Sequence, residues 1–283
     1  MTLQESTYKS LITPVPHDVP CKPPKSDRSI LDKFSMKNKV TVITGGAGSI
    51  GMAIAEGFAQ AGGDIAIVDY KYEPLISKKL EQEYNVRAKS YQLDVSVPEE
   101  VEAVVKQIEA DFGTIDVFIA NAGIAWTKGS ILKPENSVKD WTRIYDVDVH
   151  GVYYCARYVG EVFKRNGKGS LILTASMSAH IVNVPNYQTA YNSAKAAVLH
   201  MGKSLAVEFA GFARVNTVSP GYTNTPLSDP IPTAQRAKWW GLTPMGREAE
   251  PEELVGAFLY LACDASSFTT GTDIRVDGGY CSV

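Results

Sequence analysis

Apolar runs alternate with segments of helical periodicity from residue 39 to the end of the chain. Short apolar runs bounded by turn residues are typical of buried strands, and apolar positions spaced three and four apart are typical of amphipathic helices. Strands are expected at 39–44, 63–69, 88–95, 115–120, 170–175, 213–219 and 273–277, and helices at 50–61, 74–84, 98–112, 137–165, 186–209 and 251–263. This alternation predicts an α/β fold, a single Rossmann-type, doubly wound parallel sheet of about seven strands with helices on both faces.

The first 35 residues have a different character. They contain the segment PVPHDVPCKPPKSD, whose prolines are too dense for a helix or a central strand. We expect residues 1–35 to form an irregular, proline-rich arm packed on the body or on a neighbouring subunit. Residues 36–283 are expected to form one domain, which is long enough to bury a large core.

A glycine-rich turn, TGGAGSIG at residues 44–51, connects the first expected strand to the first helix. Glycines allow a tight turn and a close backbone approach to a pyrophosphate, and the helix N-terminus that follows is partially positive. The spacing is not the common Gly-x-Gly-x-x-Gly, and a turn without a ligand is the alternative. The motif nevertheless predicts a dinucleotide site, and its candidate residues are Gly45, Gly48, Ser49, Ile50 and Gly51.

The second expected strand ends at Asp69, 18 residues after Gly51. A carboxylate at this place can accept hydrogen bonds from both ribose hydroxyls of adenosine. It would also repel a 2′-phosphate, at a cost of a few kcal/mol for charges about 4 Å apart. NAD(H) is therefore favoured as the cofactor over NADP(H), which would need Lys71 to turn back toward the phosphate. The alternative is that Asp69 only caps the strand.

The ends of the next two strands carry further candidates for cofactor binding. After the third strand a carboxylate could reach the adenine amino group, and after the fourth strand small residues would let the chain pass close to adenosine. Ligands of such sheets bind beyond the carboxyl ends of the strands. The residues concerned are Asp94, Val95, Asn121, Ala122 and Gly123.

Tyr191 and Lys195 lie four residues apart on an expected helix and therefore share one face. They are either a proton-donating tyrosine with the lysine that tunes it, or an ordinary solvated pair. A chain with 14 tyrosines is expected to contain such a spacing by chance, so the pair alone does not decide. Ser176, directly after the fifth strand, lies at the same expected edge of the sheet.

Taken in order, these motifs resemble the short-chain dehydrogenase/reductase family, and within it the yeast carbonyl reductases and the fungal sorbose-reductase-type polyol dehydrogenases. The resemblance runs from about residue 34 to the C-terminus and rests on TGGAGSIG, Asp94, NAG at 121–123, Ser176, Tyr191-x3-Lys195, Pro220-Gly221 and DGGY at 277–280. It implies an oxidoreductase that transfers a hydride between a nicotinamide cofactor and a ketone or secondary alcohol, such as a ketose, a sugar alcohol or a small diol. It also implies a homo-oligomer, a dimer or a tetramer.

The resemblance implies a role for each catalytic candidate. Tyr191 would be the general acid in ketone reduction and the base in the reverse direction. Lys195 would hold the nicotinamide ribose and lower the pKa of Tyr191, and Ser176 would hydrogen-bond the substrate oxygen. Lowering a phenol pKa of about 10 by about 3 units requires about 4 kcal/mol, for which Lys195 and the positive nicotinamide of NAD⁺ are the obvious sources.

Two positions depart from the family pattern. Ser176 precedes Tyr191 by 15 residues, whereas the more common separation of 13 would select Ser178; we prefer Ser176 because it directly ends the strand. In DVDVHG, Asp148 stands where the family usually has an asparagine that is thought to hold a proton-relaying water. Asp148 is interpreted as a member of the relay or as a helix-kink residue without a proton role. The candidate catalytic residues are Ser176, Tyr191, Lys195 and Asp148.

The segment after the sixth strand supplies the last candidates. Four residues are expected to bind the cofactor there, the threonines through the nicotinamide carboxamide or the pyrophosphate: Pro220, Gly221, Thr223 and Thr225. Trp239 and Trp240 could form a lid over a substrate or pack in the core. Three residues between the serine and the tyrosine could line a pocket or only pack the loop: His180, Val184 and Tyr187.

The composition of the chain limits the kinds of binding partner that we expect. The net charge is −3 without a basic block, so neither a nucleic acid nor an anionic membrane is expected as a partner. No stretch of about 18 apolar residues and no targeting peptide is evident, which makes the cytoplasm the default location. No cysteine or histidine spacing predicts a metal site, and the four cysteines are expected as reduced thiols.

We therefore expect a short-chain NAD(P)-dependent alcohol dehydrogenase or ketone reductase with a small-molecule substrate. An NADPH-dependent carbonyl reductase that acts on similar ketones is a closely related possibility. A non-catalytic NAD-binding sensor would belong to a different class of protein. Epimerisation and enoyl reduction are different reactions that the same fold could support.

Overall fold

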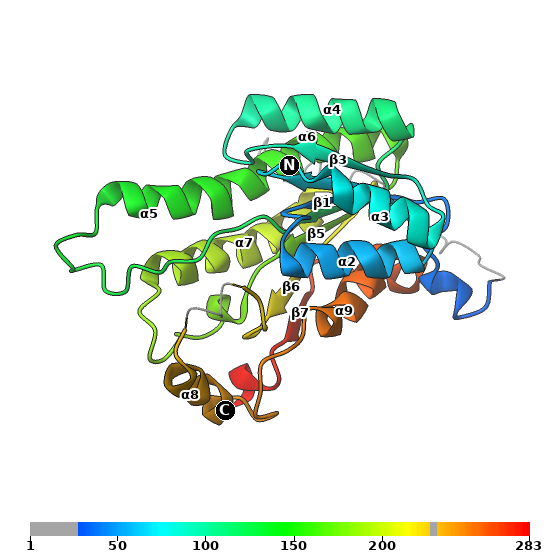
Figure 1. Cartoon of the computed structure of the whole chain (residues 1–283). Helices are drawn as coiled ribbons and strands as arrows, with labels where there is room; N and C mark the ends of the chain where they lie inside the picture. Colours follow the sequence, from blue (N-terminus) through cyan, green and yellow to red (C-terminus); the bar gives the residue numbers. More distant parts are fainter. Residues whose placement is uncertain (1–27, 227–230) are drawn as a thin grey trace, which may run out of the picture.

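A parallel sheet of seven strands forms the centre of the molecule in a computed structural model that describes residues 28–226 and 231–283 (Figure 1). The strand order is β3-β2-β1-β4-β5-β6-β7, so the chain starts in the middle, builds toward one edge and then crosses to build the other. The predicted doubly wound α/β fold is confirmed. The strands are β1 (Val40–Thr44), β2 (Asp64–Asp69), β3 (Ala88–Gln92), β4 (Val117–Ala120), β5 (Ser170–Thr174), β6 (Arg214–Pro220) and β7 (Asp273–Val276).

Helices cover both faces of the sheet (Figure 1). On one face, Val105, Val159 and Val198 belong to a single buried apolar cluster with the strands, and on the other Phe58 and Phe258 belong to a second cluster. Because both faces of the central strands β1, β4 and β5 are buried, these strands read as nearly continuous apolar runs. The first face carries α4 (Pro98–Phe112), α6 (Gly151–Asn166) and α7 (Thr189–Glu208), and the second carries α2 (Ser49–Gln60), α3 (Pro74–Tyr84) and α9 (Glu252–Ala262).

The helix expected over 137–165 is interrupted. It consists of α5 (Val138–Tyr145), a π-helical turn (Asp146–His150) and α6, and the N–H of Gly151 donates to the carbonyl of Asp146 five residues earlier. α5 begins with a capping box, in which Ser137 and Asp140 exchange side chain-to-backbone hydrogen bonds. A π-turn inserts one extra residue into a helix and often marks a functional position.

A further helix, α8 (Thr233–Leu242), lies where a loop to residue 247 was expected. Only Trp239 of this helix is buried, so α8 lacks the apolar stripe from which a helix is recognised in a sequence. α8 lies beside the C-terminal end of the chain (Figure 1). The predicted arm 1–35 lies outside the described residues except for its last part, which includes a 3-10 helix at Asp32–Phe34.

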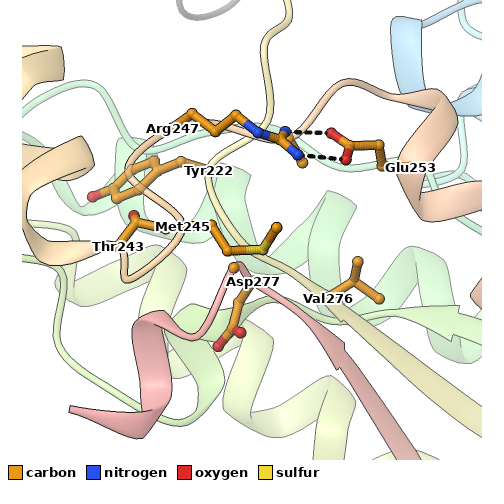
Figure 2. Close-up of a pocket in the computed structure, with 9 residues that line it drawn as sticks. Tyr222, Thr243, Met245, Arg247, Glu253, Val276 and Asp277 are labelled. Carbon is orange, nitrogen blue, oxygen red and sulfur yellow. Dashed lines mark hydrogen bonds and ion pairs between the residues drawn. The ribbon is translucent and has the colours of Figure 1, made fainter.

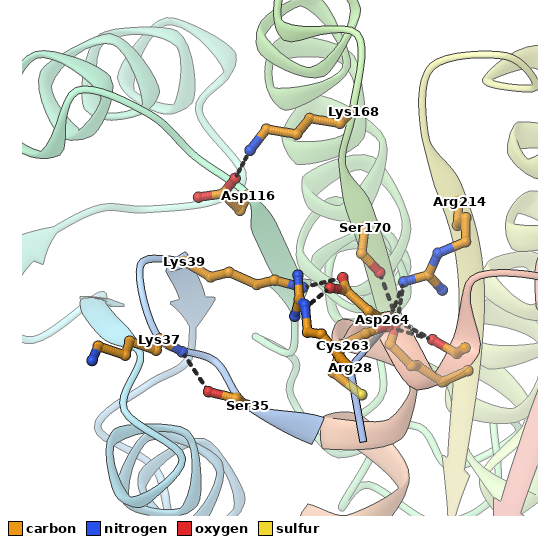
Figure 3. Close-up of polar contacts among 12 residues, drawn as sticks. Arg28, Ser35, Lys37, Lys39, Asp116, Lys168, Ser170, Arg214, Cys263 and Asp264 are labelled. Atoms are coloured by element: carbon orange, nitrogen blue, oxygen red, sulfur yellow. Dashed lines mark hydrogen bonds and ion pairs between the residues drawn. The ribbon is translucent and has the colours of Figure 1, made fainter. Parts of the chain in front are cut away.

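Charged side chains at the amino ends of the strands pair with one another (Figure 3). Lys39 lies 2.6 Å and Arg28 lies 3.0 Å from the carboxylate of Asp264. The buried Asp116 accepts a hydrogen bond from the N–H of Val40 and lies 2.8 Å from Lys168 Nζ. These contacts stabilise the edge of the sheet opposite the one at which the predicted site residues gather.

Three of the four cysteines, Cys155, Cys263 and Cys281, are free thiols, and Cys21 lies outside the described residues. Within the described ranges, no helix combines the length and apolar character needed to cross a bilayer.

Candidate active site

The glycine-rich turn leads directly from β1 into α2. Gly45 has φ +64°, and a Cβ on Gly51 would lie 2.2 Å from the Gly45 carbonyl oxygen, so a side chain at Gly51 would force the turn open. α2 begins at Ser49 after Gly48, and no side chain caps it. The first N–H groups of a helix, here those of Ser49 and Ile50, have no partner within the helix and are suited to bind a phosphate.

Asp69 ends β2 and faces this turn. One carboxylate oxygen accepts a hydrogen bond from Ala47 N at 3.1 Å, and the other accepts from Lys71 N at 3.2 Å. The carboxylate is partly exposed, and the Lys71 side chain is exposed. The negative charge therefore lies within hydrogen-bonding distance of the backbone expected to hold a dinucleotide.

Asp94 follows β3 at the same edge of the sheet. Its Oδ1 accepts hydrogen bonds from the backbone N–H and the hydroxyl of Ser96 at 2.9 and 2.6 Å. Partial burial alone would raise the pKa of Asp94, but these hydrogen bonds and the nearby charge of Arg143 lower it, so the group is held ionised. The side chain of Val95 belongs to the core, which leaves its backbone for any contact with a cofactor.

The side chain of Asn121 stabilises the sheet. Its amide donates to the carbonyl of Thr44 at 3.2 Å, and its oxygen accepts from the hydroxyl of Thr174 at 3.3 Å. In return, Thr44 Oγ1 accepts from the backbone N–H groups of Asn121 and Ala122 at 3.0 and 3.1 Å. The NAG segment thus ties the ends of β1, β4 and β5 together, a role that its position alone did not reveal.

Lys195 and Asp148 form a buried ion pair. Lys195 Nζ lies 3.3 Å from Asp148 Oδ2, and the side chains are 4% and 0% exposed. The π-helical turn carries Asp148 to this place, where its other oxygen accepts from Ile124 N at 2.8 Å. Lys195 Nζ also donates to the carbonyl of Thr174 at 3.1 Å.

Burial and the interaction between the two side chains have opposite effects on the pKa of Lys195 and on that of Asp148. Burial alone would lower the pKa of Lys195, but the interactions with Asp148 and Tyr191 together outweigh burial and raise that pKa. Burial raises the pKa of Asp148, and the Lys195 ammonium and the N–H of Ile124 oppose that rise. Lys195 Nζ at 3.3 Å and the N–H of Ile124 at 2.8 Å supply the carboxylate with a cation and a hydrogen-bond donor, an arrangement that favours the charged form of both groups.

Tyr191 lies on the same face of α7 as Lys195. Lys195 Nζ is 5.5 Å from the centroid of the tyrosine ring, so the spacing of four residues does place the two side chains together. A Cβ on Gly123 would lie 3.2 Å from both Lys195 Nζ and Asp148 Oδ2. The absence of a side chain at Gly123 therefore lets the NAG segment pass directly over the ion pair.

Ser176 and Ser178 differ in how their hydroxyl groups are used. Ser176 Oγ accepts a hydrogen bond from Ser178 N at 3.1 Å and caps a 3-10 helix at Met177–Ala179. Ser178 Oγ donates its proton to Asn183 Oδ1 at 2.8 Å. Both serines are buried, but the described contacts engage the hydroxyl proton of Ser178 and not that of Ser176.

The loop between Ser176 and Tyr191 is fastened to the sheet by His180. His180 Nε2 lies 2.9 Å from Asp273 Oδ2 and 3.4 Å from Ser219 Oγ. The ring of His180 is thus used in packing the loop. Val184 and Tyr187, the other two candidates of this loop, are 57% and 72% exposed.

The segment after β6 is shaped by its own contacts. Pro220 is the last residue of β6, Gly221 N donates to the carbonyl of Val276, and Thr223 Oγ1 donates to the carbonyl of Gly221 at 3.2 Å. Thr225 is partly exposed.

The two tryptophans of α8 have different surroundings. Trp239 is 2% exposed and stacks on Tyr222 with ring centroids 4.2 Å apart, so it packs in the interior. Trp240 Nε1 donates to Glu248 Oε2 at 3.2 Å, and the same oxygen accepts from Arg236. Tyr222, Arg236 and Glu248 were not predicted from the sequence, because their partners are distant in the chain or lie on the unpredicted α8.

A pocket that is open to solvent lies beside the ends of β6 and β7 (Figure 2). Arg247 and Glu253 close one side through two hydrogen bonds of 2.6 and 2.8 Å. The lining residues are Tyr222, Thr243, Met245, Arg247, Ala249, Glu253, Val276, Asp277 and Gly278. Ser176, Tyr191 and Lys195 are not among them, so this pocket is not the predicted catalytic site. Among the described residues, no group of three or more His, Cys, Asp and Glu side chains is arranged to hold a metal ion.

Comparison with known proteins agrees with this geometry. A protein of Yarrowia lipolytica named "Probable NADP-dependent mannitol dehydrogenase" is 53% identical over 98% of this chain and 98% of its own. A sorbose reductase of Candida albicans is 52% identical over 96% of this chain and 97% of its own. The crystal structure of an NADPH-dependent 3-quinuclidinone reductase from Rhodotorula rubra has a TM-score of 0.89 and 43% identity, covering 93% of this chain and 99% of that one.

These relatives are dehydrogenases and reductases, and the prediction of a nicotinamide-dependent oxidoreductase that interconverts ketones and secondary alcohols is confirmed. Residues 45–281 also match the family model described as enoyl-(acyl carrier protein) reductase. With a family match over most of its length and relatives above 50% identity, the chain belongs to the short-chain dehydrogenase/reductase family.

Proposed function

We propose that this enzyme interconverts a ketose and a sugar alcohol with NAD(H), and that Tyr191 is its acid and base. The observation that carries the proposal is the buried ammonium of Lys195, 5.5 Å from the Tyr191 ring, at the sheet edge that also carries the glycine-rich turn. The names of the relatives, a mannitol dehydrogenase and a sorbose reductase, support a polyol or ketose as substrate.

The residues present fit a dinucleotide. A Cβ could not be accommodated at Gly51, and the first turn of α2 offers N–H donors without a side-chain cap. The turn from Gly45 to Gly51 would hold the pyrophosphate, Asp69 the adenosine ribose, and Lys195 the nicotinamide ribose. When bound, the nicotinamide supplies or accepts the hydride.

Side chains of the protein would transfer the proton to and from the substrate oxygen. In ketone reduction the Tyr191 hydroxyl donates its proton to the carbonyl oxygen, and in alcohol oxidation the phenolate removes the hydroxyl proton. Lys195 favours the phenolate through its positive charge. Ser176 donates a hydrogen bond to the same substrate oxygen; we prefer it to Ser178, whose proton is engaged by Asn183.

We propose NAD(H) because of the position of Asp69. Its carboxylate is bonded to Ala47 N within the glycine-rich turn, so a 2′-phosphate on the adenosine ribose would meet a negative charge. The names of several relatives specify NADP and favour the other cofactor for those proteins. In this chain NADP(H) would require the exposed Lys71 to offset the charge of Asp69.

We also propose a cytoplasmic homo-oligomer, a dimer or a tetramer. Exposed aromatic side chains support an interface, since Tyr153 on α6 is 47% exposed and Phe268 is fully exposed. Size-exclusion chromatography with light scattering measures the assembly directly, and a monomer at micromolar concentration would refute it.

The function is tested with Tyr191→Phe. The variant keeps the ring that packs beside Lys195 but lacks the proton, so it should bind NAD(H) normally and lose at least about 10²-fold in kcat. Nicotinamide absorbance is followed with a panel of polyols, ketoses and aryl ketones. Near-wild-type turnover by Tyr191→Phe would refute the assignment, and Tyr187→Phe, on the exposed loop, is the matched control.

A further inference from the structure

The ion pair between Asp148 and Lys195 changes the charge that Tyr191 experiences. Asp148 Oδ2 lies 3.3 Å from Lys195 Nζ, which in turn lies 5.5 Å from the tyrosine ring. Both charged groups are almost completely buried, so solvent and salt screen them weakly. The negative charge of Asp148 must therefore oppose the positive charge of Lys195 at Tyr191.

The backbone holds the Asp148 carboxylate in this position. The π-helical turn carries it into the interior, and Ile124 N donates to Oδ1 at 2.8 Å. An asparagine at this place could accept the same hydrogen bond but would carry no charge. The aspartate thus adds a counter-charge that an asparagine would not supply.

Neighbouring charged groups are directed elsewhere. They form ion pairs with one another, Asp146 with His150, Lys128 with Asp140 and His180 with Asp273, while the charge of Arg143 acts on Asp94. Tyr145 on α5 stacks on Trp141. Among the described residues, the carboxylate that forms an ion pair with Lys195 is that of Asp148.

We propose that Asp148 is a positioning residue that offsets the charge of Lys195 and so raises the pH at which Tyr191 becomes a base. The proposal rests on the proposed role of Tyr191 and adds its pH regulation. A cation stabilises the phenolate and an anion destabilises it. When Asp148 loses its charge, the phenolate should therefore form at lower pH.

The first test is the pH dependence of kcat/KM in Asp148→Asn, which is nearly isosteric. The midpoint of the rise in alcohol oxidation should move about one pH unit lower than in the wild type. The fall in ketone reduction at alkaline pH should move in the same direction, because it reports loss of the same proton. A midpoint that stays in place or moves higher would overturn the proposal.

Asp116→Asn is the matched control. Asp116 is also a buried aspartate that pairs with a lysine, but it lies at the opposite edge of the sheet (Figure 3). Its variant should leave the midpoint unchanged, whatever it does to stability. A shift equal to that of Asp148→Asn would overturn the proposal, since it would reflect loss of any buried charge.

The second readout does not depend on turnover. Each form is titrated by phenolate absorbance and compared with the same form carrying Tyr191→Phe, so that the difference isolates Tyr191. The midpoint of that difference should fall by about one pH unit in Asp148→Asn. An unchanged midpoint overturns the proposal even if the wild type is an active dehydrogenase.

Failure of the proposed function can be told apart from failure of this proposal. If the wild type turns over no alcohol or ketone, the proposed function fails, but the absorbance difference still decides the effect of Asp148 on Tyr191. Asp148→Ser, which is smaller and uncharged, should give the same shift and replaces the asparagine variant if that one does not fold.

Discussion

His180 Nε2 lies 2.9 Å from a carboxylate oxygen of Asp273, although 93 residues separate the two in the chain. Asp273 begins β7, and its other oxygen accepts hydrogen bonds from the hydroxyl groups of Thr217 and Ser219 on β6. His180 follows the short helix that Ser176 caps. The pair therefore connects the serine loop to the outer strands of the sheet.

We predict that His180→Ala lowers kcat about tenfold, because a loosened loop would no longer hold Ser176 in the position proposed for its hydrogen bond to the substrate. The KM for the coenzyme should stay unchanged, since the glycine-rich turn is not involved. His180→Gln, which can still donate to Asp273, should recover part of the loss. Steady-state kinetics of both variants are compared with those of His200→Ala, which replaces an exposed histidine. Wild-type kcat in His180→Ala would contradict the prediction.

Thr44 offers a test of stability with a closely matched control. Its hydroxyl accepts from the N–H groups of Asn121 and Ala122, and Thr44→Val would leave both without that partner. We expect a loss of about 3 kcal/mol in the free energy of unfolding, measured by urea denaturation, together with weaker coenzyme binding.

Thr41→Val is the control for this prediction. Thr41 is fully buried on the same strand, and its hydroxyl has no hydrogen-bond partner. Its replacement by a residue of similar shape should leave stability unchanged or increase it. Equal losses of unfolding free energy in the two variants would show that strand packing, and not the hydrogen bonds to Asn121 and Ala122, determines the loss of stability.

The preference for NAD(H) over NADP(H) that we propose should depend on the charge of Asp69. Asp69→Asn keeps an acceptor for Ala47 N but removes the charge, so the ratio of kcat/KM for the two coenzymes should shift about 100-fold toward NADP(H), corresponding to a few kcal/mol. Asp69→Ala should shift it at least as far. A wild type that prefers NADP(H), or a ratio that both variants leave unchanged, would contradict the prediction.

The C-terminal turn should weaken at acid pH because of Asp277. Partial burial would raise the pKa of Asp277, but hydrogen bonds from Cys281 N and Gly279 N lower it below its ordinary value of 3.8. A carboxylate with a depressed pKa stabilises the folded state fully above its unfolded value, and the stabilisation is lost as pH falls through the folded value. The difference in unfolding free energy between the wild type and Asp277→Asn should therefore shrink between about pH 6 and about pH 3. A difference that is the same at both pH values would count against this role.

The sheet and most helices could be predicted because the central strands β1, β4 and β5 are buried on both faces and most helices show a periodic apolar stripe. Tyr191 and Lys195 could be placed together because four residues nearly complete one helical turn. The contact between Asp148 and Lys195 could not, since it spans 47 positions and depends on a π-turn that has no sequence signature. The same holds for His180 with Asp273, and α8 was missed because its only buried side chain is Trp239.

The π-helical turn also sets the relative rotation of two helices. One residue in a helix corresponds to about 100° of rotation, so deletion of a single residue between Asp146 and His150 would restore a regular helix and turn α5 about its axis relative to α6. Ile144, which packs in a cluster with Ala190 and Ala194 of α7, would then leave that cluster. The extra residue thus joins two otherwise incompatible helical registers, and this helix should tolerate substitutions on its exposed face far better than any change in its length.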